Sequence, residues 1–232
     1  MIAIVSSLVS KKIEEKLNIA TIPLPSYSKL DMPVSTHADM LVSLIDDNIF
    51  VYEDYYLNNE KLFSRIKDDY KIVKIKKDCK KKYPDDIALN VLVMGKRIFA
   101  RLDSIADEIT SYATKNGYKL INVSQGYSAC STLVISESSA ITGDKGIYQT
   151  LLNEGIRALL VNNNAIKLPG YNCGFIGGAG FLYDKKAIFF GEIEKHPDFQ
   201  KIYDFLMEEN ITKISLFGGE VYDFGGVKMI NI

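Results

Sequence analysis

Short apolar runs separated by turn residues recur along the chain, and each pair of runs precedes a stretch with helical spacing. Residues 40–45 and 49–52 are predicted strands because they are apolar and flank an Asp-Asp-Asn turn. Residues 58–67 carry apolar side chains three and four positions apart, which is typical of one buried helix face. Residues 71–75 alternate polar and apolar positions, as a strand does. The pattern predicts a unit of two strands, one helix and one strand.

The same order of elements recurs in three further units. They are predicted at 91–93, 97–100, 103–115 and 118–123; at 132–135, 140–142, 144–154 and 157–162; and at 180–183, 187–190, from 197 onward and 213–217. Asp103 is expected to cap the second helix, Asp144 to start the third, and the fourth is expected to begin near Pro197. The recurrence indicates a repeat of about 45 residues.

The two ends of the chain complete a fifth, split unit. Residues 227–232 and 2–5 are predicted to pair, Ser10 to cap a helix, and 19–22 to close the unit. Pairing the first strand with the last would remove the exposed sheet edges of an open array. We therefore predict a single α/β domain over 1–232, with five ββαβ units in a pseudo-fivefold α/β propeller. The alternative is a mixed α/β sandwich whose segments resemble one another by chance.

Composition narrows the classes of function. The 232 residues include 28 basic and 29 acidic side chains, a formal net charge of −1 that argues against a nucleic-acid binder. Three cysteines are too few for a disulfide scaffold and suit a reducing, cytoplasmic compartment. We expect neither a signal peptide nor a membrane span. The lysine-rich stretch 74–82 is expected to be a solvated connector, and no pattern indicates an oligomeric state.

Chemistry-bearing residues gather where the first strand of each unit begins, a position that a closed ring directs toward its axis. These segments are 36–39, 126–131, 172–178 and 220–226. If His37 and Asp39 lie on a strand, alternation places both on the same side. A histidine transfers protons near neutral pH, and a carboxylate binds cations. Cys130 would need such neighbours to become a thiolate nucleophile.

Glycines crowd the late segments, at 174–180 and 218–226. No Gly-Lys-Ser/Thr follows them, so they do not form a phosphate-binding loop, and no spaced dinucleotide motif precedes a helix. They are expected to allow close approach of backbones or of a ligand. Two distant histidines and no paired-cysteine spacing argue against a metal site, and no cofactor is expected.

Two of these segments resemble motifs of the guanidine-group-modifying enzymes, the penteins. Residues 36–43 (Thr-His-Ala-Asp-Met-Leu-Val-Ser) resemble the His-x-Asp strand of that family. Residues 126–132 (Gly-Tyr-Ser-Ala-Cys-Ser-Thr) are similar to its nucleophile segment, two units after the histidine. The stretch 218–226 would take the place of the family's acidic motif, which would make this chain circularly permuted. The resemblance implies five ββαβ units around an axis, over nearly the whole chain.

The resemblance also implies an activity. Cys130 would attack the central carbon of a small guanidino or other cationic compound, His37 would protonate the departing amine, and the guanidinium would be bound by Asp39 with Glu220 or Asp223. The reaction would be that of a hydrolase or an amidinotransferase. The sequence departs from the family at Ala129, where a histidine is common, and in the last unit, where the usual nucleophile strand carries Met229 and no cysteine.

Each of these residues also has a purely structural interpretation. Cys130 can be a small buried hydrophobe, His37 a core histidine that satisfies backbone groups, and Asp39 a partner of loop amides. Cys173 is a second candidate thiol, and His196 is expected to lie at a helix entrance. The family includes a non-enzymatic branch, a ribosome anti-association initiation factor. The alternative function is therefore a non-catalytic protein that binds a small ligand or a macromolecular partner.

Overall fold

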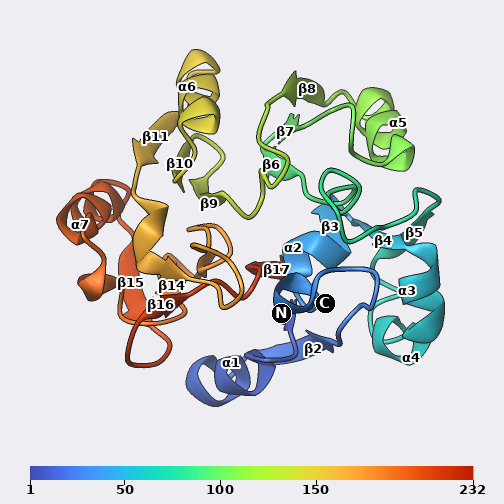
Figure 1. Ribbon diagram of the computed structural model, residues 1–232, viewed down its shortest axis with the longest axis horizontal. Helices are drawn as coiled ribbons and strands as arrows, with labels where there is room; N and C mark the ends of the chain where they lie inside the picture. Colours follow the sequence, from blue (N-terminus) through green and yellow to red (C-terminus); the bar gives the residue numbers. More distant parts are fainter. Residues whose placement is uncertain (232) are drawn as a thin grey trace.

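Five three-stranded sheets stand in a ring around a common centre, each with its helix on the outside (Figure 1). The computed structural model of the chain describes residues 1–231. In every unit a helical segment joins the second strand to a third strand that runs parallel to it. The five predicted ββαβ units are thus confirmed; Ile232, the last residue of the predicted strand 227–232, lies outside the described residues.

Four units are continuous in the chain. Their elements are β3 (Val42–Ile45), β4 (Asn48–Tyr52), α3 (Glu53–Asn58), α4 (Glu60–Phe63) and β5 (Lys71–Ile75); β6 (Leu92–Met94), β7 (Arg97–Ala100), α5 (Asp107–Lys115) and β8 (Lys119–Asn122); β9 (Thr132–Ser136), β10 (Ser139–Thr142), α6 (Lys145–Asn153) and β11 (Arg157–Leu160); β13 (Gly180–Tyr183), β14 (Lys186–Phe189), α7 (Phe199–Glu208) and β15 (Thr212–Ser215).

The fifth unit joins the two ends of the chain. Strand β17 (Val227–Ile230) pairs antiparallel with β1 (Ile2–Ser6), with Val227 opposite Val5. Helix α1 (Ser10–Leu17) then leads to β2 (Ala20–Leu24), which runs parallel to β1. The predicted closure of the ring is confirmed. The sequence did not indicate a further two-stranded sheet of β12 (Ile166–Lys167) and β16 (Val221–Tyr222), which ties two loops together near the axis.

Three short 3-10 turns, η1 (Met32–Val34), η2 (Asn163–Ala165) and η3 (Ile193–Lys195), lie in the loops. Some of the predicted helix starts agree with the structure and others do not. Helix α6 starts beside Asp144, close to the expected position, and Asp144 is its N-cap because its Oδ1 accepts the N–H of Ile147 at 2.8 Å. Asp103 caps no helix: it binds Arg101 and Ser104, and α5 begins four residues later. Ser10 is the first residue of α1 rather than its cap, and α7 begins two residues after Pro197.

The segment 38–41 departs from the prediction in a way that matters for the site. It forms the short helix α2 (Ala38–Leu41), in which the carbonyl of His37 accepts the N–H groups of Met40 and Leu41. All four helical residues are buried, and a fully buried run cannot be assigned to strand or helix from its pattern. The strand alternation expected for His37 and Asp39 is therefore wrong. The predicted helix 58–67 is also replaced by α3 and α4.

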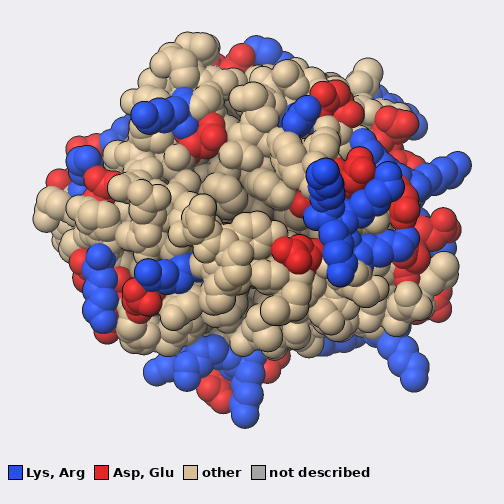
Figure 2. Space-filling view, viewed as in Figure 1, with Lys and Arg blue, Asp and Glu red and all other residues tan. Residues whose placement is uncertain are grey.

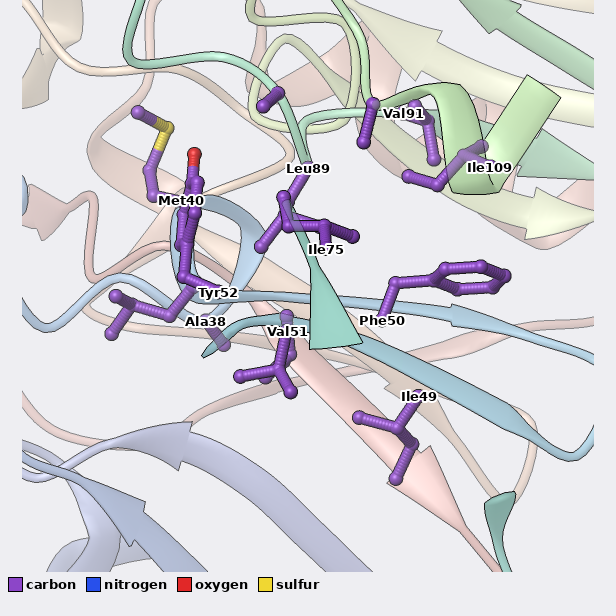
Figure 3. Close-up of a cluster of buried hydrophobic side chains, with 14 of the residues drawn as sticks. Ala38, Met40, Ile49, Phe50, Val51, Tyr52, Ile75, Leu89, Val91 and Ile109 are labelled. Atoms are coloured by element: carbon purple, nitrogen blue, oxygen red, sulfur yellow. The ribbon is translucent and has the colours of Figure 1, made fainter. Parts of the chain in front are cut away.

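The largest hydrophobic core spans the split unit and the first two units, and it includes α2. Figure 3 shows Met40 of α2 near Tyr52 and Leu89, with Phe50 and Ile109 further along the same cluster. Burial of these side chains anchors α2 at the inner end of β3. The core therefore places Asp39, the one charged residue of α2, at the centre of the ring.

The surface seen in Figure 2 carries charged side chains mainly toward its periphery, with a basic group to the right of centre, and uncharged residues dominate the middle. Within residues 1–231, no helix is both long enough and apolar enough to cross a membrane.

Candidate active site

His37 and Asp223 meet at the centre of the ring although 186 positions separate their numbers in the chain. Nδ1 of His37 lies 3.7 Å from Oδ1 of Asp223, and both side chains are almost completely buried. His37 stands at the N-cap position of α2, and Asp223 follows β16. The closure of the ring through β17 therefore brings these two residues together.

The carboxylate of Asp223 is held by the backbone. Its Oδ2 accepts the N–H of Phe175 and its Oδ1 accepts the N–H of Gly225, each at 2.9 Å. A side chain at Gly178 would overlap this carboxylate, and one at Gly225 would overlap His37. The late-chain glycines thus let the backbone approach these two side chains, as the sequence predicted. Burial raises the pKa of Asp223, while His37 and the two N–H donors oppose that rise.

Asp39 is in the first turn of α2, two residues after His37, which stands at the N-cap with an extended backbone. Its carboxylate is buried, and among residues 1–231 neither oxygen accepts a hydrogen bond of good geometry. Its backbone N–H donates to the carbonyl of Gly225, which fixes α2 against the loop that carries Asp223. The pKa of Asp39 is raised to about 6, mainly by burial and also by Asp223, while His37, Lys228 and the nearby Cys130 thiol oppose the rise.

Cys130 lies in the turn before β9 and is 4% exposed. The side-chain amide of Asn90 donates to its sulfur at 2.9 Å, and its carbonyl accepts the N–H of Gly178 at 3.0 Å. Burial, followed by the carboxylates of Asp39 and Asp223, raises the pKa of the Cys130 thiol well above its ordinary value. In the unliganded protein this thiol is therefore protonated at neutral pH.

A cavity of about 500 Å³ runs along the axis of the ring. The first strand of every unit contributes to its wall, and Asp39 is among the lining residues. Leu44, Val93 and Leu182 contribute aliphatic side chains to its walls, Thr132 and Ser136 contribute hydroxyl groups, and Lys228 adds a cation. The cavity therefore combines aliphatic and polar wall groups with a buried carboxylate that accepts no hydrogen bond of good geometry among residues 1–231.

Four of the five site residues suggested by the sequence thus lie together: His37, Asp39, Cys130 and Asp223. Glu220 does not join them, because its side chain is exposed and forms an ion pair with Lys167 at 3.4 Å.

Two further candidates also lie elsewhere. Cys173 is partly exposed and unpaired. His196 is buried at the start of the loop into α7, where Nε2 contacts the carbonyl of Asn162 at 2.8 Å and Nδ1 accepts the N–H of Asp198 at 3.1 Å. These bonds satisfy both ring nitrogens, and burial lowers the pKa of His196.

Sequence reasoning missed Asn90. This side chain is fully buried and also donates to the carbonyl of Asp39 at 3.2 Å. A signal was present, because Asn90 stands just before β6, at the strand start of the second unit. The repeat directs that position toward the axis as it does the others.

The described residues 1–231 contain no group of three or more His, Cys, Asp or Glu side chains placed to hold a metal ion. The arrangement offers two buried carboxylates, one imidazole and one thiol. Such a set can bind a small cation, move a proton and supply a nucleophile.

Comparisons with known proteins agree with this fold. Residues 4–228 match the model of a family described as "Family of unknown function (DUF6873)". No curated protein sequence matches the chain. Among solved structures, the chain is similar to DDAH from Pseudomonas aeruginosa in complex with citrulline, with a TM-score of 0.54 and 8% identity over 97% of this chain and 95% of that one.

Two further solved structures are similar. The agmatine deiminase of C. jejuni has a TM-score of 0.56 and 10% identity over 93% of this chain and 87% of that one. The amidinotransferase SxtG from Microseira wollei has a TM-score of 0.54 and 8% identity over 90% of this chain and 75% of that one. These three neighbours are penteins, so the expected fold is confirmed. The chain accordingly has the pentein fold and belongs to the family of unknown function DUF6873.

Proposed function

We propose that this protein is a cysteine-dependent enzyme that modifies a small guanidino or amidino compound, as a hydrolase or an amidinotransferase. The observation that carries the proposal is Asp39, a residue that lines the cavity and whose buried carboxylate accepts no hydrogen bond of good geometry among residues 1–231. Leaving such a charge unpaired costs several kcal/mol, so the site favours a cationic ligand. A planar guanidinium can donate two parallel hydrogen bonds to it.

A bound cation would also change the state of the nucleophile. The carboxylates of Asp39 and Asp223 raise the pKa of Cys130, and a cation bound to Asp39 would offset their charge. The amide of Asn90 already donates to the sulfur and favours the thiolate. Substrate binding would therefore produce the thiolate in place, and the unliganded thiol would stay unreactive.

The reaction then follows from the groups present. The sulfur of Cys130 bonds to the central carbon of the guanidinium and forms a tetrahedral intermediate. The C–N bond to the leaving amine breaks, and the thiol proton reaches that amine through His37. Asp223 is a positioning residue, because its carboxylate lies 3.7 Å from Nδ1 of His37 and orients the ring. Water, or an acceptor amine, displaces the sulfur from the amidino-thioether and restores the thiol.

Similarity of fold supports the general kind of reaction. The structural neighbours include DDAH, an amidinotransferase and an agmatine deiminase. At 7–10% identity this similarity assigns no role to individual residues. The roles proposed for Cys130, His37 and Asp39 are supported by the geometry of the site described above.

One observation favours the alternative, a non-catalytic protein that binds a small cation. The sulfur of Cys130 is buried, its pKa is raised, and Cys130 is not among the residues that line the axial cavity. In that case Asp39 would bind the cation and Cys130 would remain a neutral thiol held by Asn90.

Labelling with 2-chloroacetamidine and with the neutral 2-chloroacetamide separates the two functions. In the enzyme, the amidine labels Cys130 at least about tenfold faster than the amide does, because only the amidine is attracted to Asp39. Asp39→Asn is expected to remove this preference and His37→Ala to slow the labelling. Peptide mass spectrometry locates the adduct, and Cys173 in the same chain reports the reactivity of an ordinary thiol.

Equal and slow labelling of Cys130 by both reagents would refute the enzyme. A Cys130→Ser protein that still binds an alkylguanidine in calorimetry would then favour the binder.

A further inference from the structure

The axial cavity contains a second group whose charge is not compensated. Lys228 of β17 is half-buried and lines the cavity, and it forms no ion pair with any residue in the described part of the chain. The other ionisable residues of the wall are Asp39, which is buried, and Glu137, which is exposed. One unpaired anion and one half-buried cation therefore share one cavity.

The backbone of β17 limits how far Lys228 can lie from the carboxylate of Asp39. A Cβ atom at Gly226 would lie 3.9 Å from Oδ2 of Asp39, so the start of β17 is next to that carboxylate. Lys228 comes two residues later, within β17, so its backbone lies at most ~7 Å from that of Gly226. Its ammonium group is near enough to lower the pKa of Asp39, yet not near enough to form an ion pair with it.

The cavity that holds these two charges also has aliphatic groups in its wall. Leu44, Val93 and Leu182 contribute aliphatic side chains from three different units. This part of the cavity suits a short chain of methylene groups.

Resting on the function proposed above, we infer that the axial cavity selects ω-guanidino carboxylates that lack an α-ammonium group, with the guanidinium on Asp39 and the carboxylate on Lys228. Lys228 is then a specificity-determining residue. An α-amino acid such as arginine fits less well, because its ammonium would stand beside that of Lys228, and like charges at such a distance repel.

Calorimetry on the Cys130→Ser protein tests this inference without turnover. Three ligands are compared: 4-guanidinobutyrate, butylguanidine and arginine. We expect 4-guanidinobutyrate to bind about tenfold or more tightly than butylguanidine, since a charge-assisted hydrogen bond is added, and more tightly than arginine.

Lys228→Met in the Cys130→Ser protein should remove the higher affinity of 4-guanidinobutyrate over butylguanidine. The affinity of butylguanidine itself should stay within about twofold of its value with Lys228. Lys228→Arg should retain the advantage. Lys71→Met, at the exposed start of β5, is the matched control and should change neither affinity.

The outcomes separate the two claims. If butylguanidine binds as tightly as 4-guanidinobutyrate, or if arginine binds more tightly than both, the inference about Lys228 is overturned while the cation site on Asp39 stands. If none of the three ligands binds, both the inference and the proposed function fail.

Discussion

The side-chain amide nitrogen of Asn90 lies 2.9 Å from the sulfur of Cys130, while the amide oxygen of the same side chain accepts the N–H of Ala129 at 2.8 Å. The second bond fixes the orientation of the first, because a flipped amide would set its NH2 group against a backbone donor. Asn90 therefore presents a donor to the thiol, and this is the one neutral contact that favours the thiolate against two carboxylates.

Replacing Asn90 by aspartate should make Cys130 less reactive. The new carboxylate would still accept the N–H of Ala129 but would place a third negative charge beside the sulfur. We expect the pH profile of labelling by neutral chloroacetamide to move to higher pH by about one pH unit or more, and the rate at pH 8 to fall about tenfold. Asn116→Asp, at the exposed end of α5, is the control. An unchanged profile would show that the amide does not influence the thiol.

Asp39→Asn should stabilise the fold at neutral and alkaline pH. Burial raises the pKa of Asp39 to about 6 in the folded chain, above its value of about 3.9 in the unfolded chain. The protonated form therefore stabilises the native state below pH 4, and this stability is lost as the pH rises through 6. At pH 8 the variant should gain about 1–3 kcal/mol in free energy of unfolding, measured by urea denaturation.

At pH 4.5 most of that gain should disappear, because the wild-type carboxyl is then largely protonated. Asp68→Asn, an exposed position, serves as the control. A gain that is equal at both pH values would mean that Asp39 is not the buried, unpaired charge described here.

Much of the ring could be predicted because each unit repeats the same kinds of local sequence feature, such as hairpin turns and helix starts. The turn Asp184-Lys185 has both residues at positive φ, which suits the twist of a two-residue hairpin, and Asp144 satisfies a helix N–H. The start of the first unit could not be predicted in the same way. Ala38, Met40 and Leu41 are buried on all sides, so their periodicity carries no information about helix or strand.

The candidate site was predicted in part, since pairing of the chain ends brings Asp223 to His37. Glu220 and Asp223 could not be distinguished in the sequence, because burial depends on β16 pairing with β12, a contact over 50 residues in the chain. Asn90 and Lys228 lacked a motif of their own. Their roles follow from bonds to Cys130 and from the shape of the axial cavity, which exist only after folding.

Binding of an alkylguanidine should weaken as the pH falls through 6. Protonation of Asp39 removes the charge that attracts the cation, so the affinity of butylguanidine for the Cys130→Ser protein should fall about tenfold for each pH unit below that value. Calorimetry between pH 5 and pH 8 measures the slope. In Asp39→Asn the affinity should be low throughout and nearly independent of pH. A slope that persists in this variant would assign the proton to another group, such as Asp223.

Gly225→Ala should cost more stability than Gly117→Ala, although both glycines have similar backbone angles. Gly117 has φ of +71° and open space where a Cβ would stand, so alanine there should cost about 1 kcal/mol through the backbone alone. Gly225 has φ of +79°, and a Cβ there would overlap His37. Moving His37 disturbs its contact with Asp223, so we expect a loss of about 3 kcal/mol or more in urea denaturation, together with slower amidine labelling of Cys130 in the folded fraction. Equal costs at the two glycines would show that His37 is free to move, and would remove the rigid His37–Asp223 pair from the proposed mechanism.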